Sequence, residues 1–300
     1  MKIIVIFNPW ANRGKAQSKQ AELESLCQRH GFYLQITQRA GDAQRFAKEA
    51  AEAGADIVAA AGGDGTVHEV VNGLCQVENL TSLLGILPVG SGNDLAFGLG
   101  IPTRLSLAAE RLLNGQTKKV DLAKIEDENG RFQYADNNLG IGFDAQIVIQ
   151  TESINWPGGF FLYLFATLKT LFQEFRMIPL DITFDGETVQ QSTLFLALGV
   201  GARGGGGFML TPFAKHDDDL VDSCLVAEAS RLRALTLLPS AINGRHVNVK
   251  EVTMRQSKKI IIRSTDPMPI HIDGEVFAYP EDNVKAVTIT SIPKALQVRL

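Results

Sequence analysis

Three glycines and one aspartate stand where a predicted strand gives way to a predicted helix, in the run Gly62-Gly63-Asp64-Gly65-Thr66. The apolar strand 56–60 precedes this run and the helix 67–74 follows it. Glycines at such a turn let backbone N–H groups close around an anion, and the helix N-terminus adds partial positive charge. A carboxylate beside phosphate is tolerated when a divalent cation or a transferred proton lies between them. The segment therefore predicts a site for a nucleotide polyphosphate and magnesium, although such turns also occur without a ligand.

A second segment repeats this arrangement further along the chain. The short apolar strand 84–87 leads into Pro88-Val89-Gly90-Ser91-Gly92-Asn93-Asp94, and a helical run follows. In a parallel sheet, two such turns lie side by side at the carboxyl ends of neighbouring strands, where ligands bind. We therefore expect the two turns to form one site.

The ordered set of motifs resembles the catalytic domain of the diacylglycerol kinase family, which includes sphingosine and ceramide kinases and bacterial lipid kinases. This resemblance extends over essentially the whole chain, and the order of the motifs makes it specific. It implies a kinase that uses ATP and Mg²⁺ to phosphorylate a hydroxyl of diacylglycerol or a related lipid. Besides the two glycine turns, the matching motifs are Asn8-Pro9, Thr37 ahead of Gly41-Asp42-Ala43, Val120-Asp121, the segment 212–222 and Asp273-Gly274-Glu275.

The resemblance also implies roles for individual residues. Glu275 is the expected proton acceptor for the lipid hydroxyl, and Asp273 would join Asp64 and Asp121 in a network that organises magnesium and water. A structural magnesium ion is implied at the Asp218 carboxylate and at the backbone carbonyls of Lys215 and Leu220. The residues expected to line the nucleotide site are Asn8, Pro9, Thr37, Gly62, Gly63, Asp64, Gly65, Thr66, Val67, His68, Glu69, Ser91, Asn93 and Asp94.

Two positions depart from the family pattern. His68 stands where asparagine is more usual, and Asp219 stands where a glycine usually follows the metal-binding aspartate. Aspartate tolerates the left-handed backbone conformation better than most residues do. The carboxylates of 217–219 and Asp222 repel one another, which favours either a bound cation or an open hydrated loop. His216 lacks a partner at ligand spacing and is predicted to lie at the surface.

The elements that must position these residues change character along the chain. In the first part of the chain, predicted strands alternate with predicted helices. This alternation predicts an α/β domain with a doubly wound parallel sheet over residues 1–121. Extended segments dominate 122–300 and predict a β-sandwich domain, in which the last strand could pack back on the first domain. We expect the active site in the cleft between the domains, because Asp64 and Glu275 belong to different ones. Closure of that cleft would bring nucleotide and lipid together and exclude water.

The bounds of the predicted elements follow from the periodicity of apolar residues and from glycines that end a helix or mark a turn. The first domain is predicted to have strands at 2–7, 32–37 and 56–61 and helices at 16–30, 43–53 and 67–74. The second domain is predicted to have strands at 122–127, 132–139, 180–184, 193–200, 220–227, 259–264, 270–272 and 284–289.

One apolar stretch interrupts the strand pattern, from Trp156 to Phe175. It contains Lys169, it is followed by Arg176, and it is too short to span a bilayer. We expect a helix that packs on the sheet, because aromatic helices mostly fill cores. Contact with a membrane or with acyl chains stays open as an alternative.

The composition is typical of an intracellular enzyme. The 300 residues carry a formal net charge of −4, which argues against nucleic acid as a partner. Cys27, Cys75 and Cys224 lack disulfide or zinc spacing, so each is predicted to be a small apolar residue in a reducing compartment. We expect a cytoplasmic protein with a lipid substrate. Peripheral contact with the inner face of the membrane, a homodimer, and a flap at the glycines 204–207 stay open.

Two other functions also stay open. A soluble metabolite kinase of the NAD kinase type shares the Gly-Gly-Asp-Gly-Thr loop, but the turn at 91–94 favours the lipid family. A nucleotide-binding or lipid-binding regulator without catalysis is the second alternative, and the intact carboxylates of Asp64, Asp121, Asp273 and Glu275 argue against it. The segment 8–16 is not a P-loop, because Pro9 and Ala16 replace the glycine and the hydroxyl residue that the motif requires.

Overall fold

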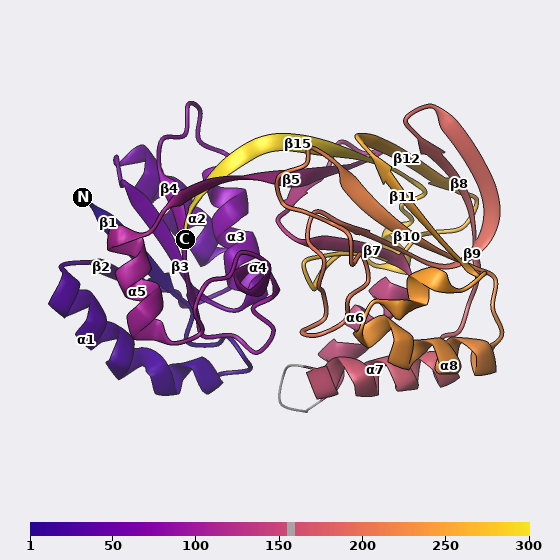
Figure 1. Cartoon of the computed structure of the whole chain (residues 1–300), viewed down its shortest axis with the longest axis horizontal. Helices are drawn as coiled ribbons and strands as arrows, with labels where there is room; N and C mark the ends of the chain where they lie inside the picture. Colours follow the sequence, from indigo (N-terminus) through magenta and orange to yellow (C-terminus); the bar gives the residue numbers. More distant parts are fainter. Residues whose placement is uncertain (155–159) are drawn as a thin grey trace. The chain divides into compact units, whose positions relative to one another are not determined.

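The computed structural model describes residues 1–154 and 160–300 (Figure 1). The chain divides into two compact units, and each is described by itself. Unit 1 comprises Met1–Val120 and Lys294–Leu300, and unit 2 comprises Asp121–Pro293. Among the described residues, no helix combines the length and the hydropathy needed to cross a bilayer.

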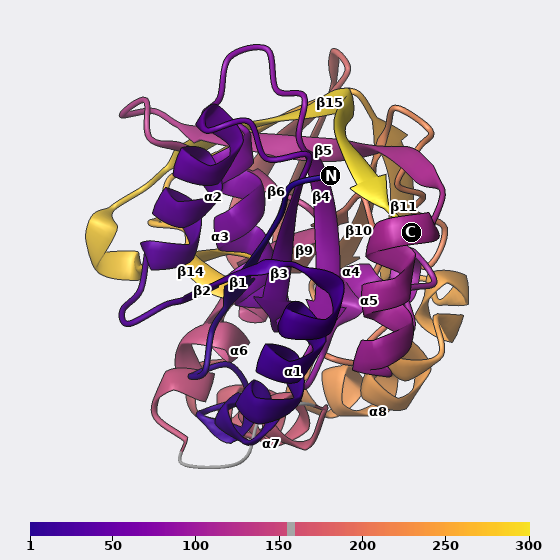
Figure 2. The ribbon, with the colours of Figure 1, turned by 90° about the vertical axis from the view of Figure 1, so that its left-hand side faces the viewer.

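Unit 1 is a parallel sheet with helices on both faces, as predicted. The strand order is β2-β1-β3-β4, and Val298 of β15 (Ala286–Arg299) pairs in parallel with Leu84 of β4. Helices α2 and α3 pack together over one face, and α1 and α5 lie on the other (Figure 2). The bounds are β1 Ile3–Phe7, η1 Lys15–Lys19, α1 Gln20–His30, β2 Tyr33–Ile36, α2 Asp42–Glu52, β3 Ile57–Gly62, α3 Asp64–Leu74, β4 Leu83–Pro88, α4 Asp94–Gly98 and α5 Leu105–Asn114.

The central strands of unit 1 are buried on both faces. Every residue of β1 and of β3 is buried, which is the usual state of parallel strands beneath two helical layers. These strands therefore form the rigid base from which the glycine turn after β3 projects.

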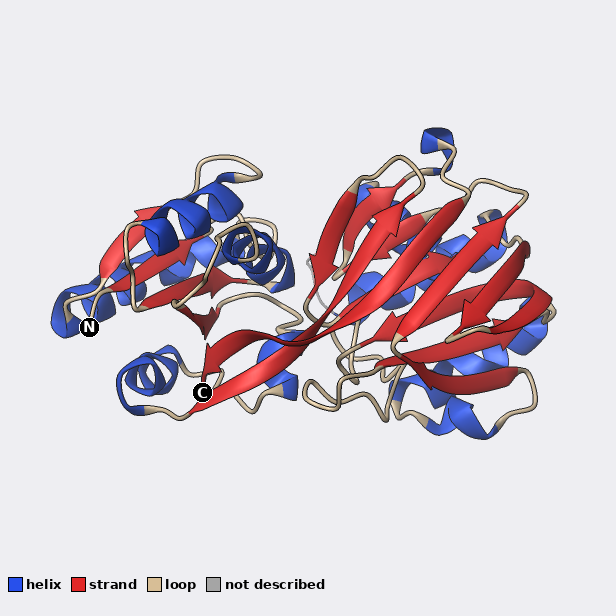
Figure 3. Ribbon diagram, turned by 90° about the horizontal axis from the view of Figure 1, so that it is seen from above, coloured by secondary structure: helices blue, strands red, loops and turns tan. Residues whose placement is uncertain are grey.

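Unit 2 is built from antiparallel strands, and Figure 3 shows them as long neighbouring arrows. The main order is β14-β13-β7-β9-β8-β12-β15, while β10 pairs with β9 and β11, and β5 pairs with β15 and β6. The bounds are β5 Thr117–Asp127, β6 Phe132–Ala135, β7 Asn138–Gly142, α6 Phe143–Glu152, α7 Phe160–Gln173, β8 Ile178–Phe184, β9 Glu187–Gly199, β10 Val221–Ala227, α8 Arg231–Ile242, η2 Arg245–Asn248, β11 Val252–Ser257, β12 Lys259–Ser264, β13 Ile270–Ile272, β14 Glu275–Ala278 and η3 Pro280–Asp282.

Alternation along β9 divides the interior of unit 2 into two cores. Leu196 and Leu198 point into a core made almost wholly of strand residues. Ala197 points the other way, into a core shared with α6, α7 and α8, and Leu194 joins that second core where the register between β9 and β10 shifts. The β-sandwich is therefore covered by helices on one side, and the predicted packing of the aromatic helix on the sheet is confirmed for one of its faces.

The structure differs from the sequence-based elements in several places. The predicted single strand 132–139 is two strands, and the predicted helix 16–30 begins as the separate 3₁₀ turn η1. The predicted strand 284–289 begins later and runs on as β15 to Arg299. Helices α6 and α8 and strand β11 were not predicted. Residues 156–159 of the predicted aromatic helix lie outside the described residues.

The three cysteines differ in accessibility, which leads to a chemical prediction. Burial raises the pKa of the Cys27 thiol to about 11 and that of Cys224 to about 12, while Cys75 is partly exposed. Because the thiolate is the reactive form, iodoacetamide at pH 8 should modify Cys75 and leave the other two intact until the chain unfolds. Peptide mass spectrometry before and after addition of urea would check this. Rapid labelling of Cys224 in the folded protein would contradict it.

Candidate functional site

The first glycine turn is itself the start of a helix. Strand β3 ends at Gly62, Gly63 is the N-cap, and α3 begins at Asp64, three residues earlier than predicted. The N–H groups of Thr66 and Val67 donate to the Gly63 carbonyl at 3.0 and 3.1 Å. A Cβ atom on Gly62 would overlap the Thr66 side chain, so this position requires glycine.

The second turn is hydrogen-bonded to the first. The N–H groups of Val89 and Gly90 donate to the Gly62 carbonyl at 3.0 and 3.1 Å. Asn93 has φ 52° and closes its own turn, because its amide nitrogen donates to the Gly90 carbonyl at 3.0 Å and its Oδ1 accepts from the Gly90 N–H at 3.1 Å. A Cβ atom on Gly90 would overlap the Cα atom of Gly63. The expectation that the two turns lie together is confirmed.

Asp64 joins the two turns through its carboxylate. Its two oxygens accept the N–H groups of Asn93 at 2.9 Å and of Asp94 at 2.6 Å, at the start of α4. Hydrogen bonds to an ionised acceptor are shorter and stronger than neutral ones. Asp64 therefore holds the second turn in place, a role that the sequence analysis did not assign to it.

Three other predicted nucleotide residues also make structural contacts. Asn8 follows β1; its amide donates to Thr66 Oγ1 at 3.1 Å, and its Oδ1 accepts from the Trp10 N–H at 3.0 Å. The Thr37 N–H donates to the Phe7 carbonyl at 2.9 Å. Glu69 accepts the N–H groups at the start of α2, and it therefore caps that helix.

The remaining predicted nucleotide residues also belong to unit 1. They are Pro9, Gly65, Val67, His68 and Ser91, of which Val67 and His68 are buried and Ser91 is exposed.

The close approach of the two turns gives a direct test. Gly90→Ala should force the turns apart and weaken the predicted binding of ATP about tenfold or more, because the added methyl group meets backbone that cannot rotate away. Gly63→Ala is a milder perturbation of the same contact and should lose less affinity, since its Cβ would lie 3.2 Å from Gly90 Cα and needs a smaller shift. Calorimetric titration with ATP would measure both variants. Equal affinity for Gly90→Ala and the parent chain would contradict this prediction.

In unit 2, the buried side chain of Asp273 binds three consecutive backbone N–H groups. Its carboxylate accepts the N–H groups of Asp136 at 3.0 Å, Asn137 at 3.1 Å and Asn138 at 2.8 Å. These donors lie at the break between β6 and β7, which explains why the predicted single strand is interrupted. Asp273 itself has φ 50° and is 7% exposed, so it differs from an ordinary solvated turn residue. Glu275, two residues later, is the first residue of β14 and is exposed.

A pair formed by the buried His271 and the half-buried Asp144, which the sequence analysis missed, supports the same turn. His271 Nε2 lies 3.1 Å from Asp144 Oδ2, and His271 Nδ1 accepts from the Gly274 N–H at 3.4 Å. This pattern fits the imidazole tautomer that is protonated on Nε2. The two residues are 127 positions apart in the chain, so no local signal could have paired them. Together they fix the peptide that precedes Glu275.

The acidic segment of unit 2 is tied to Asp121. The Asp121 N–H donates to the His216 carbonyl at 2.7 Å, and its carboxylate accepts the Asp219 N–H at 2.7 Å. Asp219 has φ 66°, the left-handed conformation expected at a position usually held by glycine. His216 is buried, so its predicted place at the surface is wrong: the segment folds inward around the fully buried Asp121.

The predicted magnesium ligands Lys215, Asp218 and Leu220 belong to this segment. The Asp218 carboxylate is half-buried and accepts the Leu220 N–H at 3.2 Å, while Lys215 is exposed. Burial raises the pKa of the neighbouring Asp222, and the charge of Asp218 adds to that effect. Carboxylate and carbonyl oxygens are the ligands that a hard cation such as magnesium prefers.

The glycines 204–207 form a tight turn in the structure. Gly204 and Phe208 exchange backbone hydrogen bonds of 2.8 and 2.9 Å, and the Phe208 ring stacks on Phe160 with centroids 5.3 Å apart. The turn therefore packs against Phe160, which is the first residue of α7.

The fold just described is shared with solved structures. Crystal structures of two Bacillus anthracis proteins, one described as a putative diacylglycerol kinase and one as a diacylglycerol kinase, superpose with TM-scores of 0.78 and 0.71, at 24% and 22% sequence identity. Each superposition covers 99% of this chain and 96% of the other. Similarity at this level of identity shows that the fold is the same.

Sequence comparison identifies the family. Residues 2–125 match the diacylglycerol kinase catalytic domain, and residues 137–300 match the YegS C-terminal NAD kinase beta sandwich-like domain. A diacylglycerol kinase of Mycobacterium tuberculosis is 32% identical over 99% of this chain and 94% of its own length. A diacylglycerol kinase of Bacillus subtilis is 29% identical over 90% of this chain and 88% of its own length. The chain therefore belongs to the diacylglycerol kinase family, and the resemblance stated from its motifs is confirmed.

Proposed function

We propose that this protein is a cytoplasmic lipid kinase that transfers the γ-phosphoryl group of ATP to a hydroxyl of diacylglycerol or a related lipid. Membership of the family supports kinase activity. The observation that carries the proposal for this chain is the pair of glycine turns held together by Asp64. Backbone N–H groups at the start of α3, next to a second glycine turn, suit a polyphosphate.

In the proposed reaction, unit 1 binds ATP and unit 2 supplies the base. Glu275 takes the proton of the lipid hydroxyl while that oxygen forms a bond to the γ-phosphorus. The bond between the γ-phosphorus and the β–γ bridging oxygen breaks, and ADP leaves with the electron pair. Magnesium, when bound, neutralises the phosphate charge. The fixed carboxylates of Asp64, Asp121 and Asp273 are proposed to order magnesium and water, and Lys215, Asp218 and Leu220 to hold the structural ion.

The decisive experiment is a phosphorylation screen with radiolabelled ATP and Mg²⁺. The purified chain is offered total lipid extract in one reaction and NAD in another, and labelled products are identified by chromatography and mass spectrometry. We expect label in a phosphorylated glycerolipid. Label in NADP would favour a metabolite kinase, and ATP binding without a labelled lipid would favour a regulator without catalysis.

The pair His271 and Asp144 near Glu275 leads to a further expected result. His271→Leu removes both contacts of the imidazole, and we expect kcat to fall about 10- to 100-fold because the base is misplaced. His271→Gln, which can still donate to Asp144, should recover part of the loss. Steady-state kinetics with varied ATP would show the change in kcat with little change in the KM for ATP. Unchanged kcat in His271→Leu would rule out this positioning role.

A further inference from the structure

The side chain of Asn138 stands beside the turn that carries the proposed base. Asn138 is the first residue of β7, and its backbone is bonded twice to Asp273. Its N–H donates to the Asp273 carboxylate at 2.8 Å, and its carbonyl accepts the Asp273 N–H at 2.8 Å. Glu275 follows Asp273 by two residues. The Asn138 side chain therefore projects from backbone that is fixed relative to this turn.

The Asn138 amide occupies space that a glycine leaves open. A Cβ atom on Gly204 would overlap the Asn138 amide nitrogen, so glycine at this position makes room for the amide. Asn138 is half-buried, and within residues 1–154 and 160–300 its side chain has no hydrogen-bond partner. Polar groups removed from water normally find a partner, and an amide offers both donors and an acceptor. The amide is therefore suited to bind a ligand.

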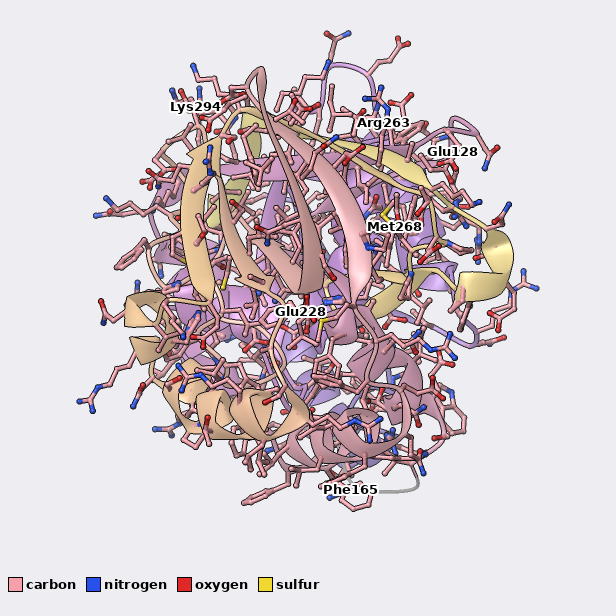
Figure 4. The ribbon with its side chains drawn as sticks, turned by 90° about the vertical axis from the view of Figure 1, so that its right-hand side faces the viewer. Glu128, Phe165, Glu228, Arg263, Met268 and Lys294 are labelled. Carbon is pink, nitrogen blue, oxygen red and sulfur yellow. The ribbon has the colours of Figure 1, made fainter. Side chains whose placement is uncertain are left out.

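Tyr163 spans the separation between the glycine turn 204–207 and the turn 273–275. The position that a Cβ atom of Gly205 would take lies 3.5 Å from Tyr163 Cδ1, and the corresponding position of Gly274 lies 2.9 Å from the Tyr163 hydroxyl oxygen. Residues two apart on a helix point to opposite sides, and Phe165 is 51% exposed and points away from the ribbon (Figure 4). Tyr163 therefore faces the two turns, which lie one tyrosine ring apart.

Aromatic rings border the other end of the glycine turn. The Phe208 ring stacks on Phe160, and a Cβ atom on Gly207 would lie 3.0 Å from Phe160 Cδ2. The neighbourhood of this turn thus has a polar end, formed by the Asn138 amide and the base turn, and an apolar end formed by the rings. A molecule with a hydroxyl and a carbonyl at one end and hydrocarbon at the other has the matching polarity.

We infer that Asn138 binds the acyl-ester carbonyl next to the acceptor hydroxyl of a glycerolipid. The amide nitrogen donates to the carbonyl oxygen, while Glu275 takes the hydroxyl proton on the adjoining carbon of the same molecule. Asn138 takes no part in proton transfer. It determines specificity, because it favours an acylated glycerol over an ether lipid or a simple alcohol. The inference rests on the proposed function, since it names the group by which the acceptor is recognised.

The test compares two acceptors that differ only in this carbonyl. One is a glycerol with an octyl ether and, next to the free hydroxyl, an octanoyl ester; the other is the glycerol dioctyl ether. The full chain is assayed with ATP and Mg²⁺ in one detergent, and kcat/KM is measured for each acceptor. We expect the parent chain to prefer the ester about tenfold, the effect of one lost hydrogen bond.

The preference should disappear when the amide is removed. Asn138→Leu keeps a similar volume without hydrogen bonding, so it should lose about tenfold with the ester and keep its rate with the ether. ATP affinity should not change, since nucleotide binding is proposed for unit 1. Asn248→Leu is the matched control, because Asn248 is an exposed asparagine at the end of η2 with no proposed role. It should retain the preference for the ester.

Gly204→Ala displaces the amide without removing it. The atoms nearest to the added methyl group belong to the end of the Asn138 side chain, which can rotate away, so the protein should fold as judged by circular dichroism. Its preference for the ester should fall towards one, and it decides the test if Asn138→Leu does not fold.

The outcomes separate this inference from the proposed function. A parent chain without a preference, or a preference that survives in Asn138→Leu, would overturn the role of Asn138. Phosphorylation of another lipid but of neither glycerol acceptor would overturn it as well. A chain that phosphorylates no lipid at all would instead refute the proposed function.

Discussion

Replacing Glu275 by glutamine is expected to lower kcat about 10²- to 10⁴-fold, the range typical of losing a general base. The glutamine keeps the size and polarity of the side chain but cannot take the proton of the attacking alcohol. Because Glu275 is exposed at the start of β14, the substitution should leave folding intact. ATP affinity should also be unchanged, since the proposed nucleotide site belongs to unit 1. Initial rates with saturating lipid and ATP, together with a thermal melt, would measure both effects.

Glu281→Gln is the matched control for this variant. Glu281 is another exposed carboxylate of unit 2, in η3, and it has no proposed role in the reaction. It should retain full turnover. A normal kcat in Glu275→Gln would show that another group accepts the proton.

Asp64→Asn is expected to cost about 10²-fold or more in kcat/KM, because it disrupts the contact between the two glycine turns. The carboxylate offers both oxygens to the N–H groups of Asn93 and Asp94, whereas an amide presents one oxygen and an NH₂ group that would face a donor. The loss of negative charge also weakens the remaining hydrogen bond. The protein should stay folded, since the buried strands β1 and β3 of unit 1 do not depend on this contact.

Asp56→Asn serves as the control for Asp64→Asn. Asp56 precedes the same strand at its other end, where it accepts the N–H of Lys2 and is well exposed. Steady-state kinetics and ATP titration should leave this variant close to the parent. Parent-like kcat/KM in Asp64→Asn would mean that the turns hold their geometry without the carboxylate.

The features predicted from sequence are those that depend on neighbouring residues. Glycine turns after apolar strands, and the alternation of strand and helix, are local patterns, so the parallel sheet of unit 1 and the pairing of its turns could be predicted. The left-handed conformation of Asp219 could also be anticipated from the residue type.

The features that escaped prediction depend on contacts between distant segments. Asp273 binds backbone groups 135 to 137 residues away, and Asp144 meets His271 only after β7, α6 and β13 are assembled. The burial of His216 follows from the folding of its segment around Asp121. The sequence also left open which aromatic residues of α7 face outward, because a run of aromatic residues does not reveal which of them the sheet will cover; Phe161, Phe165 and Phe172 are the exposed ones.

The division of the chain has a consequence for synthesis on the ribosome. Unit 1 is closed by residues 294–300: Val298 pairs with Leu84, and the Arg299 guanidinium donates to the carbonyls of Leu112 and Leu113 at the end of α5. Translation delivers these residues only after all of unit 2 has emerged. Unit 1 therefore lacks the strand that covers one edge of its sheet until unit 2 has been synthesised, and a chaperone would protect the exposed edge during that interval.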